Sequence, residues 1–399
     1  MKKFKIGKKE IIHFVGIGGI GMSGLAQIMK VMGFTVQGSD INFNKNIENC
    51  KKLGIKVFIG HKKSNISKAN LLVKSSAIKN NNIEIKFSRQ KKIPIYERVE
   101  MLANIVSLKK NIIVSGSHGK TTTTSLIAKI LSLAKIDPTI INGGVINSIK
   151  NNAKLGKSEW TVLEADESDG SFLKLPVNYS IVTNIDHEHL DHYENFQNLQ
   201  KAFVEFLDKT PPIGKSFVCI DDINIKRVIK KLSTKNYLTY GKDKRADFQI
   251  TRIKYYNKST MFDLKIKNFN GKEKLIKNIN LNLTGDYNVK NATAALSVSL
   301  TLGIKINIIK EALKNFSGVQ RRMTKIFSKN RNDFYDDYAH HPTEIKSVLK
   351  SLKTTSFGRK IVAVFQPHRY SRLRLLKKDF ASAFKDSDLV ILCPVYAAG

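Results

Sequence analysis

The chain has 399 residues, which is long enough for two or three domains that each bury a core of their own. Its 68 Lys and Arg residues against 33 Asp and Glu residues give a net charge of +35, but the basic residues are spread along the whole chain without a basic tail, so the charge predicts attraction of anionic ligands and no nucleic-acid partner. The 3 cysteines, Cys50, Cys219 and Cys393, lie far apart and exclude a disulfide framework and a Cys-x-x-Cys zinc site.

The first predicted element is a buried strand over residues 11–15, which leads directly into a glycine-rich loop at residues 16–21. A helix is predicted over residues 22–29, and a second strand over residues 35–40 ends in Asp40. That acid lies about twenty residues past the glycines, as in a dinucleotide-binding crossover. Taken alone, the pattern predicts only a diphosphate at a helix N-terminus, and an ordinary tight turn gives the same match.

The same stretch has an alternative interpretation as a membrane span or a signal segment. No Asp, Glu, Lys or Arg occurs between Ile11 and Met29, and lysines precede it. The 5 glycines of the stretch and the lack of a small-residue cleavage site argue against both alternatives. The sequence therefore predicts a soluble strand–turn–helix, no membrane partner and a cytoplasmic location.

A second glycine loop, Ser-Gly-Ser-His-Gly-Lys-Thr at residues 115–121, follows a predicted strand at residues 111–114 and opens a helix. We call residues 115–121 the phosphate loop. Its glycines let backbone N–H groups turn around a phosphate, Lys120 adds a positive charge, and the hydroxyl of Thr121 is a ligand for Mg²⁺. The two glycines are closer together than in the commonest pattern of this kind, and the alternative is a Gly/Ser turn with an incidental lysine. Strand, loop and helix nevertheless occur in the order that a phosphate site requires.

Two polar clusters follow two further predicted strands. Residues 161–163 lead into the acidic run 164–169, and residues 181–184 lead into the Asp/His-rich run 186–192. Clustered acids repel one another unless a cation compensates, and acids with histidines at strand ends suit a metal beside a nucleotide. A zinc site is the alternative for the second run, but no cysteine accompanies it. A solvated polar loop is the alternative for either run alone.

The pattern of apolar and polar residues changes over residues 245–285. Apolar and polar residues alternate over 248–253, 261–266 and 276–283, and Asn270-Gly271 is a hairpin signal. This predicts a small antiparallel sheet inserted in, or appended to, a parallel one.

A third part begins near Gly318 and contains predicted buried strands at residues 361–365 and 389–392. The chain therefore divides into three α/β parts.

Six motifs in this order resemble the Mur ligase family, and the resemblance covers the whole chain. They are residues 16–21, 116–121, 164–173, 183–193, 336–345 and 365–372. The resemblance implies a Rossmann-like UDP-sugar-binding domain at residues 1–107 and a central P-loop ATPase-type α/β domain with a small antiparallel sheet at residues 108–317. It implies a Rossmann-like amino-acid-binding domain at residues 318–399.

Within the family, the motifs look most like those of members that join L-alanine to UDP-N-acetylmuramate in peptidoglycan precursor synthesis. In that reaction, ATP phosphorylates the lactyl carboxylate, the amine of L-alanine attacks the acyl phosphate, and phosphate leaves. The cofactors implied are ATP and Mg²⁺, with Mn²⁺ as an alternative, and the protein is expected to be a monomer or a weak homodimer.

The resemblance also assigns roles to residues. The residues implied in ATP binding are Gly116, Ser117, His118, Gly119, Lys120, Thr121, Thr122, Asn288 and Asn291. Those implied in UDP-sugar binding are Gly16, Gly18, Gly19, Ile20, Gly21, Asp40, Ser75 and Ser76. Metal binding is implied for Thr121, Glu164 and His189, and amino-acid binding for Tyr338, His368, Arg369 and Arg372. The catalytic set implied is Lys120, Glu164, His189, His340, His368, Arg369 and Arg372.

Two departures from the family pattern concern Tyr287 and the end of the chain. The family usually has histidine where Tyr287 stands, and tyrosine can still stack on adenine. Residues 394–399 form a motif that a glutamate and a further stretch normally follow, which predicts an incomplete third domain. The alternatives are a ligase that recycles a whole tripeptide onto the same sugar and a truncated, non-catalytic nucleotide-sugar-binding fragment. A nucleic-acid-dependent ATPase is a third alternative, and only the net positive charge of the chain suggests it.

Overall fold

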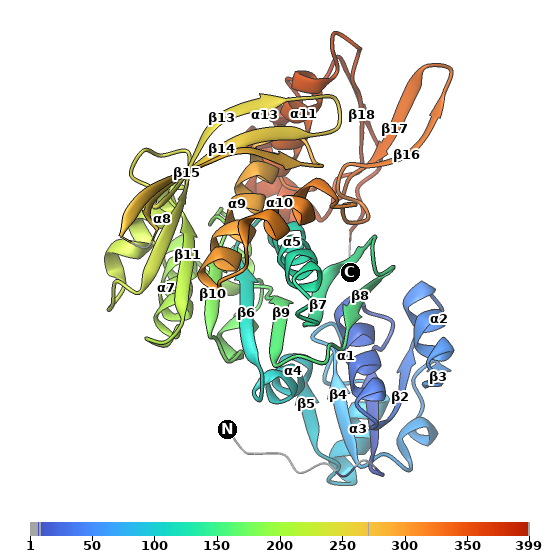
Figure 1. Ribbon diagram of the computed structural model, residues 1–399. Coiled ribbons are helices and arrows are strands. Elements are labelled where there is room, and N and C mark those ends of the chain that lie inside the picture. Colours follow the sequence, from blue (N-terminus) through green and yellow to red (C-terminus); the bar gives the residue numbers. More distant parts are fainter. Residues whose placement is uncertain (1–6, 8, 270, 398–399) are drawn as a thin grey trace.

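The computed structural model describes residue 7 and residues 9–269 and 271–397. The chain forms three α/β parts that follow one another in sequence, coloured blue to cyan, teal through green and yellow to orange, and orange to red in Figure 1. The three-domain α/β prediction is confirmed at this level. Among the described residues, none of the helices combines the length and the apolar character that a membrane span requires.

The N-terminal part is a parallel five-stranded sheet in the order β3-β2-β1-β4-β5. Its strands are β1 (Ile11–Val15), β2 (Thr35–Asp40), β3 (Lys56–Ile59), β4 (Leu71–Lys74) and β5 (Ile95–Glu97). Its helices are α1 (Ile20–Val31), α2 (Lys45–Lys52), α3 (Ile83–Gln90) and α4 (Arg98–Val106), with the short 3₁₀ helix η1 (Lys63–Ile66). The strand order reverses between β1 and β4, and ligands of open α/β sheets bind outside the carboxyl ends of strands at such a point. The first glycine loop and Ser75 follow these two strands.

The central part is a ten-stranded sheet in the order β15-β14-β13-β12-β11-β10-β6-β9-β7-β8. The strands are β6 (Lys110–Ser115), β7 (Thr139–Ile146), β8 (Asn151–Lys154), β9 (Trp160–Glu164), β10 (Tyr179–Val182), β11 (Lys215–Cys219), β12 (Tyr237–Gly241), β13 (Phe248–Tyr255), β14 (Thr260–Phe269) and β15 (Lys272–Leu281). The helices are α5 (Lys120–Leu133), α6 (Leu190–Tyr193), α7 (Phe196–Asp208), α8 (Ile223–Val228), α9 (Asp286–Thr301) and α10 (Ile306–Lys314), with the 3₁₀ helices η2 (Ser171–Lys174) and η3 (Ile229–Lys231).

The predicted antiparallel strands are present and extend the edge of this same sheet. β13 pairs in parallel with β12, and β14 and β15 continue in antiparallel pairing. The antiparallel strands are therefore appended to the parallel sheet, which is one of the two predicted arrangements. Asn270 of the predicted turn lies outside the described residues.

At the opposite edge, β8 pairs antiparallel with β7, a hairpin that the sequence did not predict. This hairpin packs on α1 of the N-terminal part. The Nδ2 amide of Asn152 donates to the carbonyl oxygen of Ile20 at 2.9 Å, and that of Asn151 donates to Oε1 of Gln27 at 2.9 Å. One hydrophobic core runs through both parts, so α1 and the β7–β8 hairpin form a packed joint.

The C-terminal part contains the hairpin β16 (Thr324–Lys329) and β17 (Asn332–Asp336) and the parallel pair β18 (Val362–Phe365) and β19 (Leu389–Leu392). Its helices are α11 (Pro342–Thr355), α12 (Tyr370–Leu375) and α13 (Lys377–Ala383). A small core of Ile345, Leu349, Ile361, Phe365 and Ala383 joins α11 and α13 to the strand pair. Both predicted strands are present, but the prediction that they are buried is wrong, because Val364, Leu389 and Leu392 are exposed. The predicted end motif reaches Ala398 and Gly399, which lie outside the described residues.

Candidate functional site

The phosphate loop connects the end of β6 to the start of α5. Gly116 and Gly119 adopt positive φ angles of 122° and 85°. A Cβ on Gly116 would lie 2.4 Å from Oγ1 of Thr183, and one on Gly119 would lie 2.5 Å from Oδ1 of Asn291. Only glycine fits these places, because the loop backbone is pressed against β10 and α9. The result is a tight turn at a helix N-terminus, which is a ready-made phosphate site.

Lys120 is held inside this loop. Its ammonium donates to the carbonyl oxygen of Gly116 at 2.6 Å and to the carboxylate oxygens of Glu167 at 2.9 and 3.2 Å. Glu167 is fully buried, and burial raises its pKa to about 7 in spite of the attraction of Lys120. Glu167 belongs to the acidic run that the sequence singled out, but it was not among the predicted site residues.

The three predicted metal ligands fall into two neighbouring groups. The Thr121 hydroxyl donates to Oε1 of Glu164 at 3.1 Å, and the N–H of Gly143 donates to Oε2 at 2.7 Å. In the described part of the chain, His189 instead has its ion-pair contacts with Glu167, at 3.6 Å, and with Glu188, at 3.9 Å.

The donor set beside the phosphate loop fits a divalent cation. Asp166, Glu167 and His189 present ligand atoms that lie within 4.8 Å of one another. Carboxylate and hydroxyl oxygens are the ligands that Mg²⁺ prefers in proteins. The acids at the end of β9 therefore suit Mg²⁺ at the mouth of the phosphate loop.

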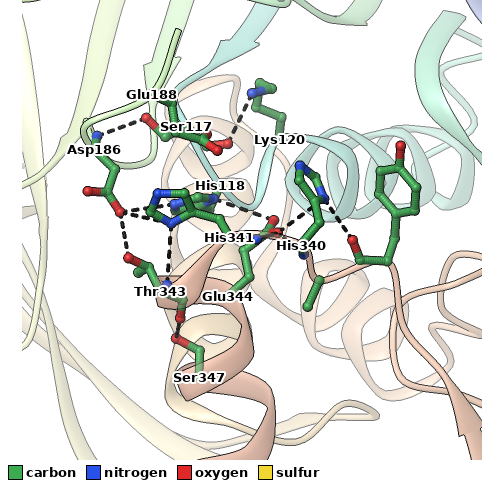
Figure 2. Close-up of polar contacts among 12 residues, drawn as sticks. Ser117, His118, Lys120, Asp186, Glu188, His340, His341, Thr343, Glu344 and Ser347 are labelled. Carbon is green, nitrogen blue, oxygen red and sulfur yellow. Dashed lines mark hydrogen bonds and ion pairs between the residues drawn. The ribbon is translucent and has the colours of Figure 1, made fainter. Parts of the chain in front are cut away.

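A second polar cluster connects the phosphate loop to α11 (Figure 2). Nε2 of His118 lies 3.1 Å from Oδ2 of Asp186, and Nδ1 lies 3.4 Å from Oε1 of Glu344. Burial alone would lower the pKa of His118, but hydrogen bonds to the two carboxylates outweigh it and raise the pKa to about 10. His118 is therefore an imidazolium at neutral pH.

The predicted amino-acid-binding residues come together at the start of α11 and α12. Nδ1 of His340 lies 2.8 Å from the carbonyl oxygen of Tyr338, and the rings of His340 and His368 are 5.8 Å apart. Nη1 of Arg372 donates to Nδ1 of His368 at 3.1 Å. Nη2 of Arg372 lies 3.8 Å from Oε1 of Glu188, which is buried beside His189. This group thus reaches the central part.

Arg369 lies at the N-cap of α12 with φ of 67°, and its N–H donates to the carbonyl oxygen of Tyr396 at 2.9 Å. Within the described residues, no hydrogen bond or ion pair of its guanidinium is recorded, so the charge is available to a ligand.

A cavity of about 860 Å³ lies between the phosphate loop, α9 and α11. Its lining includes His118 and Gly119, the predicted Asn288 and Asn291, and Tyr287. A drug-sized or nucleotide-sized ligand needs about 300–1,000 Å³. The structure thus brings the two predicted asparagines to the phosphate loop. It adds a wall from β12 and β13 that includes Tyr240 and Tyr255, which no motif in the sequence indicated.

The first glycine loop is fixed by the strand beside it. The N–H groups of Gly16 and Ile17 donate to the carbonyl oxygen of Ser39 at 2.8 and 3.0 Å, and that of Gly18 donates to Oδ2 of Asp40 at 2.8 Å. Asp40 therefore already has a backbone partner in the loop.

Ser75 lies against this loop, since its Cβ is 3.3 Å from where a Cβ on Gly16 would stand. Ser76 is exposed, and no hydrogen bond of its side chain is recorded in the described part of the chain. On the other side, Nη1 of Arg98 lies 3.3 Å from where a Cβ on Gly21 would stand. The sequence did not assign Arg98 a role, and its guanidinium is suited to a diphosphate.

The β7–β8 hairpin connects the two loops. A Cβ on Gly144 would lie 2.9 Å from Cγ2 of Thr121, and Nδ2 of Asn142 donates to Oγ of Ser125 in α5 at 2.8 Å. At its other end the hairpin holds Ile20 of the first glycine loop through Asn152. One element therefore spans from the first glycine loop to the phosphate loop.

Three family models match successive parts of the chain. They are the Mur ligase family catalytic domain at residues 11–110, the Mur ligase middle domain at residues 114–299, and the Mur ligase glutamate ligase domain at residues 321–398.

Similar proteins extend over the whole chain. A UDP-N-acetylmuramate–L-alanine ligase of Pelagibacter ubique is 58% identical over 398 residues, which is 100% of this chain and 86% of that protein. One from Brucella anthropi is 44% identical over 389 residues, 98% of this chain and 83% of that protein. The crystal structure of the UDP-N-acetylmuramate–alanine ligase of Thermotoga maritima matches with a TM-score of 0.84 and 31% identity, covering 97% of this chain and 86% of that one. A murein peptide ligase from Psychrobacter arcticus shares the fold with a TM-score of 0.75 at 22% identity, covering 96% of this chain and 91% of that one.

Proposed function

The chain belongs to the Mur ligase family, and we propose that it joins L-alanine to the lactyl carboxylate of UDP-N-acetylmuramate, with ATP converted to ADP and phosphate. The single observation that carries this proposal is the 58% identity, along the whole chain, to a ligase with that name. The product would be the first peptide-bearing precursor of peptidoglycan, made in the cytoplasm.

The reaction needs activation, because a carboxylate does not accept an amine directly. Phosphorylation by ATP gives an acyl phosphate, the amine of L-alanine adds to its carbonyl carbon, and the tetrahedral intermediate expels phosphate. Proximity and charge neutralisation are then the main tasks of the protein.

The central part, proposed as residues 108–317, would bind ATP in the cavity between α9 and α11. Tyr287, Asn288 and Asn291, which line this cavity, would contact the nucleoside, and the N–H groups of the phosphate loop would contact its phosphates. The phosphates would replace Glu167 as the partner of Lys120, because phosphate and carboxylate both offer oxygen atoms to the same ammonium.

Thr121 and Glu164 would hold a Mg²⁺ ion, together with His189 and the acids near it. When bound, Mg²⁺ neutralises the phosphate oxygens between which the γ-phosphoryl group is transferred. Mn²⁺ has the same ligand preferences and is an alternative.

The N-terminal part, proposed as residues 1–107, would hold the UDP diphosphate at the first glycine loop, with Ser75 and Arg98 at its sides. The C-terminal part, proposed as residues 318–399, would bind L-alanine with the charges of Arg369 and Arg372. Guanidinium groups pair with carboxylates and phosphates through two parallel hydrogen bonds.

The test is phosphate release by the full chain with ATP, Mg²⁺, UDP-N-acetylmuramate and L-alanine, omitting one component at a time. Release that needs all four supports the ligase. Release without L-alanine, or release that needs the tripeptide L-alanyl-γ-D-glutamyl-meso-diaminopimelate in its place, contradicts the proposal; the latter result would assign the chain to peptide recycling.

A further inference from the structure

Asp186 connects the phosphate loop to the C-terminal part. It follows β10, and its N–H donates to Oγ of Ser117 at 2.8 Å. Its Oδ2 faces Nε2 of His118 at 3.1 Å and accepts a hydrogen bond from the hydroxyl of Thr343 at 2.6 Å (Figure 2). Thr343 lies 157 residues further along the chain, in the first turn of α11. One carboxylate oxygen therefore contacts both the phosphate loop and α11 of the C-terminal part.

Glu344 has a matching double role from the side of α11. Its Oε2 accepts from the N–H of His340 at 3.0 Å and from that of His341 at 3.4 Å, so this oxygen caps the helix. Its Oε1 lies 3.4 Å from Nδ1 of His118 and 3.6 Å from Nη1 of Arg322. The helix start is thus built around a carboxylate that also reaches the phosphate loop.

The imidazolium of His118 consequently has one carboxylate at each nitrogen, one from the central part and one from the C-terminal part. Its main chain is equally fixed. The N–H of His118 donates to Oδ1 of Asn184 at 2.9 Å, and its carbonyl oxygen accepts from the hydroxyl of Thr183 at 2.6 Å. The ring is therefore attached to a hydrogen-bonded segment of the loop backbone. The N–H groups of that backbone would hold the phosphates.

We propose that His118, Asp186, Thr343 and Glu344 form a closure latch, through which docking of α11 sets the conformation of the phosphate loop. Asp186, Thr343 and Glu344 are positioning residues, since none is assigned to the reacting atoms, whereas His118 also belongs to the predicted ATP-binding loop. The inference rests on the proposed function for its meaning in catalysis. Interfaces between domains of one chain are commonly mobile, and charge-assisted hydrogen bonds are among the stronger polar contacts that can hold one closed. Coupling of this kind is reciprocal, so nucleotide binding favours closure as much as closure favours nucleotide binding.

The variant that tests the latch is Thr343→Val, which removes the cross-domain hydroxyl and keeps the shape of the side chain. Its matched control is Ser356→Ala at the other end of α11, where the hydroxyl donates only to the carbonyl oxygen of Lys353. Circular dichroism and thermal melting establish that both variants fold.

Small-angle X-ray scattering of the full chain reports closure directly. We expect Thr343→Val to have a larger radius of gyration than the wild type without nucleotide, and Ser356→Ala to match the wild type. ADP at saturation should reduce the difference. Equal radii for Thr343→Val and the wild type would overturn the latch.

ADP binding by calorimetry tests whether the contact passes through Asp186. We expect Thr343→Val to weaken ADP binding about fivefold in the wild-type background and to have no further effect in Asp186→Ala, because the oxygen that accepts from Thr343 is then absent. The same loss in both backgrounds would show that the hydroxyl acts by another route and would contradict the proposal. A purely structural role of Thr343 predicts this second result.

These measurements do not require turnover. If the wild type binds ADP and shows the expected closure but does not ligate L-alanine, the proposed function fails while the latch stands. If it ligates L-alanine and Thr343→Val behaves as the wild type in both experiments, the latch fails and the function stands.

Discussion

The ammonium of Lys120 donates to the carbonyl oxygens of Gly116 and Ser117 as well as to Glu167, so it is a fully engaged group before any substrate arrives. A phosphate that binds in the loop would take the place of the Glu167 carboxylate, which is also negatively charged. The ammonium would therefore keep a negatively charged partner throughout. This arrangement explains why the lysine can be largely shielded from solvent, because a charge removed from water is costly unless a partner accompanies it.

Replacing Lys120 by Met should reduce kcat for phosphate release by about 10²–10³-fold, because the developing charge on the transferred phosphoryl group loses its fixed cation. The matched control is Lys129→Met in the same helix, whose side chain has no recorded polar contact among the described residues and should leave kcat unchanged. Steady-state kinetics of both variants provide the comparison. An equal reduction of kcat in both variants would contradict this role of Lys120.

Gly116→Ala should abolish nucleotide binding, because the new Cβ would lie 2.4 Å from Oγ1 of Thr183 and 2.8 Å from the carbonyl oxygen of Asn184. Gly54→Ala is the control for backbone strain alone, since Gly54 has φ of +72° with nothing within 4 Å of its Cβ position. ADP titration of both variants distinguishes the effects. Normal binding by Gly116→Ala would show that the loop does not need this close approach.

At the scale of elements, the sequence located what depends on local pattern and missed what depends on distant partners. The strand–loop–helix units at residues 11–29 and 111–134 were predictable because their glycines and apolar spacing lie within one short window. The β7–β8 hairpin was missed because β7 contains Asn142-Gly143-Gly144, which resembles a turn, and β8 is a polar strand stabilised by α1.

The hairpin is the joint between the first glycine loop and the phosphate loop, and Asn152 is a buried contact within it. The buried Nδ2 of Asn152 donates to the carbonyl oxygens of Ile20 and Asn142 at 2.9 and 3.4 Å. Asn152→Ala leaves these oxygens without that partner, so we expect the free energy of unfolding to fall by about 1–3 kcal/mol. Urea unfolding measures it, with the exposed Asn80 in Asn80→Ala as a control; an unchanged midpoint for Asn152→Ala would contradict the assigned role.

A buried network stabilises the N-terminal part by joining α3 to the sheet. The carboxylate of Glu84 accepts from Oγ of Ser39 at 2.6 Å and from Nδ2 of Asn65 at 2.7 Å, and it lies 3.5 Å from Nε2 of His13. Burial alone would raise the pKa of Glu84, but these partners outweigh it and lower the pKa from 4.5 to about 2. The resulting stability is present above about pH 4.5 and is lost as the pH falls toward 2.

Glu84→Gln should therefore lower the free energy of unfolding at pH 7 by on the order of 3 kcal/mol, and the difference from the wild type should shrink as the pH falls below 4.5. Denaturant unfolding at pH 7 and pH 3.5 gives the comparison, and the exposed Glu48 in Glu48→Gln serves as a control with little effect. If the free energies of unfolding of Glu84→Gln and the wild type differ by the same amount at both pH values, the role assigned to the Glu84 carboxylate is wrong.

At the scale of the whole molecule, one substrate site is proposed for each of the three parts, and two structural joints relate the parts. The β7–β8 hairpin joins the first glycine loop to the phosphate loop, and the cluster around His118 joins the phosphate loop to α11. Neither joint could be predicted, since contacts such as Thr343 with Asp186 depend on packing across 157 residues. The motifs that contain Asp186 and Thr343 could be predicted, because each is a local pattern, but neither residue was among the predicted site residues.

The central claim is that this chain activates the lactyl carboxylate of UDP-N-acetylmuramate as an acyl phosphate and transfers it to L-alanine. The most direct test uses UDP-N-acetylmuramate with ¹⁸O in both oxygens of that carboxylate, incubated with the full chain, ATP, Mg²⁺ and L-alanine. Mass spectrometry should find one ¹⁸O in the amide product and the other in the released phosphate. Unlabelled phosphate, or phosphate released without any amide product, would contradict the account.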